Sequence, residues 1–121
     1  MSSNDYYVIA YKLMSYLYAC LKQGEHPSLE FLESGTKVFP VTESYWEYIL
    51  QHLFEDGYIE GAKVIPILGK SKAGIRLTPD IMITPKGIEY LEDNSAMQRA
   101  KRFIEDAAAI TGGMRSLLPW L

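Results

Sequence analysis

The sequence predicts a mainly helical α+β domain in which three helices precede a two-stranded β-hairpin and two further helices follow it. Apolar residues recur every three or four positions in the first half and again near the C-terminus, as in amphipathic helices. Between these regions, two runs rich in Ile and Val flank "GKSKAG", a stretch of turn-forming and basic residues. The 121 residues suffice for one compact domain.

The first helix is expected over residues 5–23 and ends at Gly24, because glycine accepts the left-handed conformation that closes helices. One apolar face faces the core, and Cys20 on it is interpreted as a buried hydrophobe, not a nucleophile. A second face is apolar as well and carries Tyr7, Tyr11, Met14 and Tyr18. This face packs on another part of the same chain or contacts a second subunit.

A short second helix is predicted within "HPSLEFLESG", where a Pro-Ser start and a Gly stop enclose one or two turns of apolar residues. The third helix is predicted over "TESYWEYILQHLFED". Thr42 is its expected N-cap, and Ser44 with Glu47 forms an alternative capping box. Its apolar face comprises Trp46, Ile49, Leu50, Leu53 and Phe54.

The hairpin pairs "GAKVIPIL" with "IRLTPDIMIT". Pro66 and Pro79 lack the N–H that a strand donates, so each belongs at an edge, a bulge or a strand end. Thr84 is the expected N-cap of the next helix, with Pro85 at its first position. The last helix is predicted over residues 95–110, and "TGG" separates it from the apolar tail "MRSLLPWL".

Three helices followed by a two-stranded wing is the winged-helix order. "HLFEDGYIEG" and "ITPKGIEYLEDNS" resemble the signature of the YjcQ-like family, small winged-helix proteins of Gram-positive bacteria and their prophages. The resemblance runs from about Tyr6 to about Ile110 and is least clear over residues 24–41 and after Thr111. It implies a winged-helix fold and a phage-like setting. We expect a winged-helix domain over residues 1–93, and a C-terminal helix and apolar tail over residues 94–121 that pack on it or on a second subunit. The resemblance implies no catalytic or binding residue.

The sequence contains no recognisable catalytic constellation. The Gly-Lys-Ser of "GKSKAG" lacks the earlier glycine of a phosphate-binding loop, since Val64 stands there, and a strand follows it instead of a helix. His26 and His52 lie on different elements without a partner at metal-ligand spacing. We therefore expect a non-enzymatic protein with no cofactor, no metal and no evident small-molecule substrate.

Binding to double-stranded DNA is one interpretation. Five cations in and near the wing could contact phosphates, and the exposed positions of the third helix would face the groove. The phosphate-contacting candidates are Lys63, Lys70, Lys72, Arg76 and Lys86, and the groove-facing candidates are Ser44, Glu47, Tyr48 and Gln51. The third helix offers no cation there, so any DNA binding is expected to be weak, and a charged hairpin tip is often simply solvated.

Protein contact is the favoured interpretation. The first helix, the last helix and the tail carry more apolar surface than a domain of this size needs, and a symmetric dimer would bury it. The candidate dimer interface is Tyr7, Tyr11, Met14, Tyr18, Phe103, Leu117, Leu118 and Trp120. Packing of the tail within its own chain is the alternative.

Charge and hydropathy indicate which partners and which cellular location to expect. Residues 1–60 carry three lysines against nine acids, a net charge of −6, whereas residues 61–121 carry nine cations against six acids, a net charge of +3. An anionic partner should therefore meet the second half. No apolar run has the length of a transmembrane helix and the N-terminus does not read as a secretory signal, so a cytoplasmic protein that stays off the membrane is expected.

Overall fold

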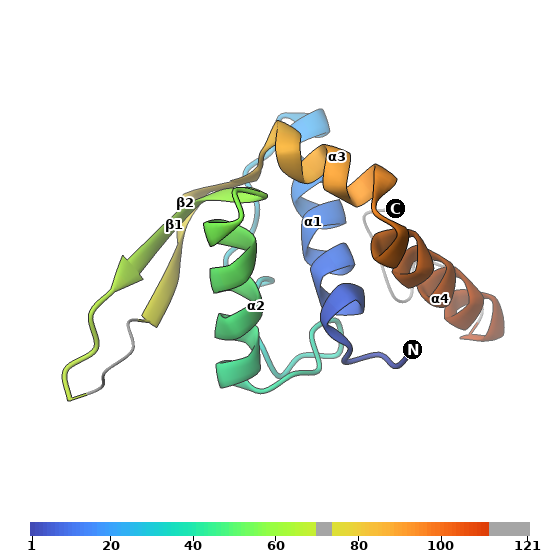
Figure 1. Ribbon diagram of the computed structural model, residues 1–121, viewed down its shortest axis with the longest axis horizontal. Coiled ribbons are helices and arrows are strands. Elements are labelled where there is room, and N and C mark those ends of the chain that lie inside the picture. Colours follow the sequence, from blue (N-terminus) through green and yellow to red (C-terminus); the bar gives the residue numbers. More distant parts are fainter. Residues whose placement is uncertain (70–73, 112–121) are drawn as a thin grey trace.

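The protein has an α+β fold that is mainly helical, seen here in a computed structural model that describes residues 1–69 and 74–111. In this part of the chain, four helices accompany one two-stranded antiparallel sheet (Figure 1). The elements are α1 (Tyr6–Gln23), α2 (Glu43–Glu55), β1 (Ile59–Ile65), β2 (Gly74–Ile83), α3 (Pro85–Asp93) and α4 (Ser95–Thr111).

Helix α1 lies at the centre and contacts α2, α3, α4 and β2. Every residue from Val8 to Ser15 is buried, so the helix is enclosed on all sides over two turns. This explains its two apolar faces, because the second face packs inside the same chain at Tyr11 and Met14. Gly24 ends the helix with a φ of 69°, as the sequence predicts.

The short second helix predicted after α1 is not formed, and residues 25–42 are turns and irregular chain. One helical turn begins where Leu32 N–H donates to the Ser28 carbonyl oxygen, at 3.3 Å. Gly35, with a φ of 77°, then reverses the chain, and its N–H points to the carbonyl oxygens of Phe39 and Val41 at 3.0 Å. A single turn is too short to propagate as a helix, so the local turn bonds prevail.

This irregular segment nevertheless contributes to the core. Phe39 is fully buried, and its ring centroid lies 4.7 Å from that of Trp46 on α2. The buried Lys12 of α1 donates a 2.9 Å hydrogen bond to the Val38 carbonyl oxygen. The segment therefore occupies part of the space that a second helix would have filled.

Helix α2 begins as predicted, because the Thr42 hydroxyl oxygen accepts a hydrogen bond from Tyr45 N–H at 3.3 Å. Its buried face consists of Trp46, Ile49, Leu50 and Leu53. The chain leaves the helix through Asp56 and then Gly57, whose φ is 80°.

Strands β1 and β2 form the predicted hairpin, with Ile59 opposite Ile83 at its base and Lys63 opposite Arg76 further out. The register shifts between Glu60 and Ala62, which creates a bulge. Pro79 lies on the other strand at this bulge, one of the positions expected for it. Beyond the bulge, the hairpin continues along the side of α2 that faces away from α1 (Figure 1), and Ile75 in its outer part is buried.

Helix α3 also begins as predicted. Thr84 accepts a 3.0 Å hydrogen bond from Gly87 N–H and Pro85 occupies the first turn. Helix α4 then packs on α1 and α3, with Met97, Ala100, Ile104 and Ala108 buried. No helix in the described residues is long and apolar enough to cross a membrane.

Candidate interaction surfaces

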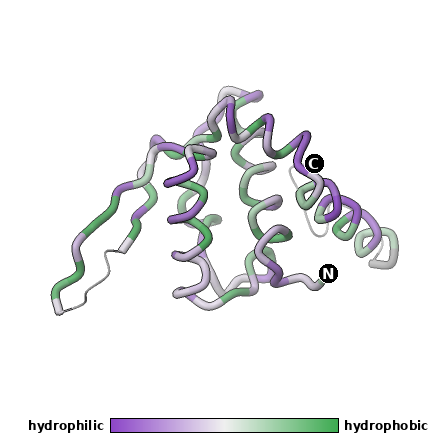
Figure 2. The backbone as a smooth tube through the Cα atoms, viewed as in Figure 1, coloured by the Kyte–Doolittle hydropathy of each residue, from purple (hydrophilic) through white to green (hydrophobic). Residues whose placement is uncertain are grey.

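The outer part of the hairpin exposes residues 63–68, a segment that is apolar except for Lys63 and that we call the arm. Val64 is 49% exposed, Ile65 and Ile67 are more than one-third exposed, and Leu68 is completely exposed. Hydrophobic residues therefore continue toward the tip of the hairpin, away from the core (Figure 2). The cause is geometric, because the sheet has only two strands, and in its outer part β2 supplies the buried side chain, Ile75, while β1 is exposed from Lys63 onward. Contiguous exposed apolar side chains are typical of interaction sites.

A second surface lies between α1, α2 and α3 and is lined mainly by tyrosine rings. We call it the tyrosine groove. It has a volume of about 420 Å³. Its lining residues are Tyr6, Tyr7, Tyr45, Tyr48, His52, Asp56, Tyr58 and Tyr90. Tyrosine combines a large apolar ring with a polar hydroxyl and is enriched at protein interfaces.

Ring contacts tie this groove together across three elements. Tyr58 and Tyr90 stack with their centroids 4.2 Å apart. The rings of Tyr48 and His52 lie 4.3 Å apart on α2, and Tyr6 of α1 meets Tyr48 edge-on at 6.3 Å. The exposed fraction of Tyr48 is still 55%, so most of its ring is available to a partner.

Burial, and to a smaller extent the Asp56 carboxylate, disfavours the phenolate form of three tyrosines in the groove. Burial raises the pKa of Tyr90 to about 12, with further contributions from Tyr7, Tyr58 and Asp56. Burial also raises the pKa of Tyr6 and of Tyr58, and the Asp56 carboxylate again adds to both shifts. The three phenols therefore stay neutral beyond the pH at which an ordinary tyrosine ionises, and the Asp56 carboxylate lies among them.

One cation of the chain already lies beside this surface. The Lys86 ammonium group is 5.3 Å from the centroid of the Tyr58 ring and donates a 2.7 Å hydrogen bond to the Asp56 carbonyl oxygen. The approach of a cation to a tyrosine face is favourable, and it is strengthened by nearby carboxylates. The tyrosine surface is thus suited to basic side chains.

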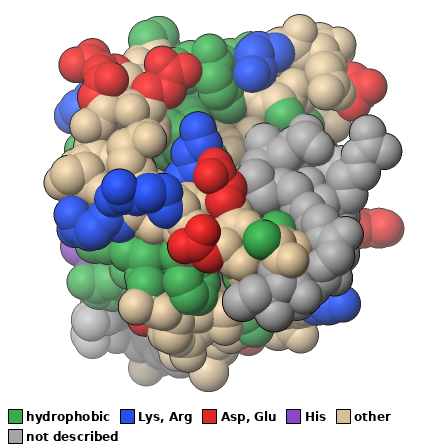
Figure 3. All heavy atoms as spheres, turned by 90° about the vertical axis from the view of Figure 1, so that its right-hand side faces the viewer, with side chains coloured by type: hydrophobic (Ala, Val, Ile, Leu, Met, Phe, Trp, Pro, Cys, Tyr) green, Lys and Arg blue, Asp and Glu red, His purple; other side chains and the backbone are tan. Residues whose placement is uncertain are grey.

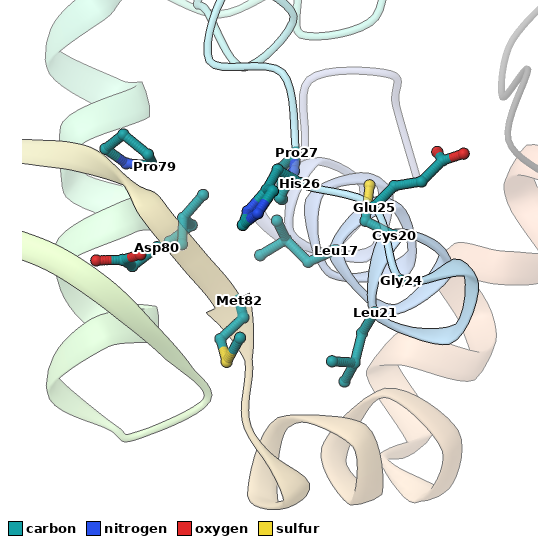
Figure 4. A pocket seen from close by; sticks show the side chains of 11 residues that line it. Leu17, Cys20, Leu21, Gly24, Glu25, His26, Pro27, Pro79, Asp80 and Met82 are labelled. Carbon is teal, nitrogen blue, oxygen red and sulfur yellow. The ribbon is translucent and has the colours of Figure 1, made fainter.

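A smaller hollow lies between the end of α1 and β2 (Figure 4). Its volume is about 210 Å³, and exposed Leu21 and Met82 stand at its rim. Burial raises the pKa of the Cys20 thiol in its wall, which disfavours the reactive thiolate. The space is suited to one apolar side chain more than to an extended segment.

The structure places the residues that were predicted to contact phosphate in different parts of the molecule. Lys63 and Arg76 are exposed and directly opposite each other on the hairpin. Arg76 also lines a hollow with Glu33, Glu43 and Glu47, whose carboxylates compete with phosphate for its charge. Lys86 lies on α3 beside Tyr58, whereas Lys70 and Lys72 lie outside the described residues.

The cations of α4 lie far from Lys63 and Arg76, because α4 and the hairpin lie on opposite sides of the molecule (Figure 1). On the side that contains α4, basic and acidic side chains are interspersed (Figure 3). Arg99, Lys101, Arg102 and Asp106 are the exposed charges of this helix.

The residues of α2 that were predicted to face a DNA groove lie in different surroundings. Ser44 is exposed and Glu47 is half-buried in the hollow beside Arg76. Gln51 donates a 3.0 Å hydrogen bond to the Glu55 carboxylate. Tyr48 belongs to the tyrosine groove, so its surroundings favour contact with a protein or a cation over contact with a base edge.

The candidate dimer interface is also divided. Met14 is fully buried and Tyr11 nearly so, which leaves neither side chain surface for a partner. Tyr18 is half-buried with Lys22 4.3 Å over its ring, and Phe103 is half-buried in the core cluster. Tyr7 is exposed in the tyrosine groove. Leu117, Leu118 and Trp120 lie outside the described residues.

Sequence reasoning did not identify the arm or the tyrosine groove. The apolar run "VIPIL", which lacks the alternation of a half-buried strand, was a signal for the arm. Nine tyrosines in 121 residues were a signal for the groove. Within the described residues, no group of three or more His, Cys, Asp or Glu side chains could hold a metal ion.

Comparison with known proteins gives one match. A family model described as "YjcQ protein" matches residues 11–108. No curated protein and no solved structure matches the chain. The matched range runs from the second turn of α1 nearly to the end of α4 and includes the whole hairpin.

Proposed function

The chain belongs to the YjcQ family, and from this premise we propose that it is a non-enzymatic winged-helix module of phage or prophage type that makes protein contacts. The order of α1, α2, hairpin and α3 supports the winged-helix interpretation, with α2 as the third helix and the hairpin as the wing. The turns of residues 25–42 stand where the second helix would be.

The exposed arm is the observation that carries the proposal. Residues 63–68 stay outside the core, since the side chains that the hairpin buries are those of Ile59, Ile75, Ile81 and Ile83. A solvated arm would be expected to carry polar residues, and this one carries Val64, Ile65, Ile67 and Leu68. A partner that covers these side chains would remove them from water.

Photo-crosslinking in cells tests the proposal. A photoreactive amino acid replaces Leu68, and a matched control carries it at Glu30, an exposed loop position that lines neither the arm nor the groove. We expect position 68 to give discrete protein adducts, identified by mass spectrometry, that position 30 does not give. The same adducts from both positions, or none from either, would contradict a protein-contacting arm.

Weak binding to double-stranded DNA is the second candidate. The observation in its favour is the cross-strand pair Lys63 and Arg76, which places two exposed cations at one level of the hairpin. Anisotropy of a labelled random duplex at low salt, about 50 mM, tests it, because phosphate contacts are strongest there. Binding that weakens linearly on a log–log plot of affinity against salt, and that is lost in Lys63→Glu, would put this candidate first.

A further inference from the structure

We propose that the tyrosine groove receives the arm of a second copy of the same chain. This rests on the proposed protein-contact function and assigns its partner. The two surfaces are complementary in chemistry, because the arm presents four apolar side chains next to the ammonium group of Lys63, and the groove presents tyrosine rings next to the carboxylate of Asp56.

The groove suits an extended apolar segment better than the other hollows do. Its volume of about 420 Å³ is twice the 210 Å³ of the hollow at the end of α1. The hollow beside Arg76 is comparable in volume, at about 400 Å³, but three glutamates and Arg76 line it. Tyr7 and Tyr48 supply exposed rings on which aliphatic side chains can pack.

The charges match as well. The Asp56 carboxylate contributes to the raised pKa of three tyrosines, and Lys86 shows that an ammonium group is stable beside Tyr58. Lys86 offsets part of this negative charge, whereas Glu89 and Asp93 beside Tyr90 add to it. An incoming lysine therefore meets a net excess of carboxylates.

The arm and the groove of one chain do not meet. The arm lies on the side of α2 that faces away from α1, while the groove lies among α1, α2 and α3 (Figure 1). In a two-fold dimer each copy gives its arm and receives that of its partner, so both contacts form and the assembly closes.

Sedimentation equilibrium of the purified chain over a range of concentrations tests the proposal. The arm variant Val64→Ser/Leu68→Ser and the groove variant Tyr48→Ser change only side chains that are about half exposed or more, so both should fold, which circular dichroism verifies. Leu21→Ser is the matched control, an exposed leucine outside both surfaces.

We expect the wild type and Leu21→Ser to sediment with twice the mass of one chain, and each surface variant to sediment as a monomer. An equal mixture of the two variants should associate more tightly than either variant alone, because the intact arm of one fits the intact groove of the other in one of the two contacts. A monomeric wild type, variants that dimerise like the wild type, or a mixture that associates no more tightly than either variant alone would overturn the proposal. A monomeric wild type that still gives specific adducts at position 68 would leave the proposed function standing with another partner.

A charge exchange provides a second test. In the proposed dimer, Lys63 of one copy lies against Asp56 of the other. Lys63→Glu should therefore weaken dimerisation at least several-fold, and adding Asp56→Lys to the same chain should restore dimerisation. Both side chains are exposed, so the changes leave the core intact. A double variant no tighter than Lys63→Glu alone would overturn the pairing.

Discussion

The rings of Tyr58 and Tyr90 stack at 4.2 Å with an angle of 22° between their planes, which fixes the turn after α2 against α3. The stack forms one wall of the tyrosine groove, and the Lys86 ammonium group lies on the face of Tyr58. It links the geometry of the groove to the position of α3, so a change that displaces α3 should also alter the groove.

Alkaline pH should weaken the fold through Tyr90. Its pKa is raised to about 12 in the folded protein, above the ordinary value of 10.0, because burial disfavours the phenolate. The unfolded chain therefore loses this proton first, and the stabilisation present below pH 10 disappears as pH rises to about 12. Denaturant unfolding at a series of pH values from 9 upward measures this loss of stability. The free energy of unfolding of Tyr90→Phe should fall less steeply with pH than that of the wild type. Identical slopes would contradict this interpretation.

The N-cap of α3 should matter more than that of α2. The Thr84 hydroxyl accepts from Gly87 N–H at 3.0 Å and donates to the Gly57 carbonyl oxygen at 2.5 Å, whereas Thr42 accepts from Tyr45 N–H at 3.3 Å. Thr84→Ala should lower the free energy of unfolding by about 2 kcal/mol and Thr42→Ala by about 1 kcal/mol. Chemical denaturation measures both free energies of unfolding. A larger loss for Thr42→Ala than for Thr84→Ala would show that the hydrogen bonds of the two hydroxyl groups do not determine which cap matters more.

Gly87→Ala should destabilise the protein even though alanine is the better helix former. A Cβ at Gly87 would collide with the Tyr58 carbonyl oxygen and lie 2.8 Å from Cγ1 of Ile83. Helix propensity alone predicts a gain of up to about 1 kcal/mol, whereas the clash should cost about 1 to 3 kcal/mol. A lower melting temperature supports the close approach of α3 to the turn, and a higher one would contradict it.

Phe39 should behave as a core residue although it lies in irregular chain. It is fully buried, and its ring contacts those of Trp46 and Phe31 with centroids 4.7 and 5.8 Å away. Phe39→Ala should therefore lower the free energy of unfolding by about 3 to 5 kcal/mol. Leu29→Ala, at an exposed position of the same segment, should change it little. Equal effects would show that the segment does not close the core.

Local signals in the sequence were sufficient where short-range bonds decide the structure. Thr42 and Thr84 cap their helices as expected, because the side chain and the N–H that it accepts are three residues apart. Pro79 lies at the bulge for an equally local reason, its missing N–H. Residues 25–42 depend instead on the distant contacts of Phe39 and Lys12, so their helical spacing was misleading.

The candidate surfaces depend on tertiary arrangement, which spacing along the chain does not encode. The tyrosine groove combines residues from Tyr6 to Tyr90, and no window of sequence contains them. Met14 was expected at an interface, but it is fully buried, whereas Val64, Ile65, Ile67 and Leu68 of the hairpin are exposed. Exposure, rather than hydrophobicity, distinguishes an interface from a core.

The most direct test of a protein-contacting arm is its accessibility in the cell. Leu68→Cys and, as a control, Glu30→Cys are labelled with a maleimide in intact cells and as dilute purified protein, and Cys20 is buried and should react slowly. If a partner covers the arm, the labelling rate at position 68 relative to position 30 falls several-fold in cells. The same ratio in both settings would mean that the arm stays exposed to water, and would contradict its role as a contact surface.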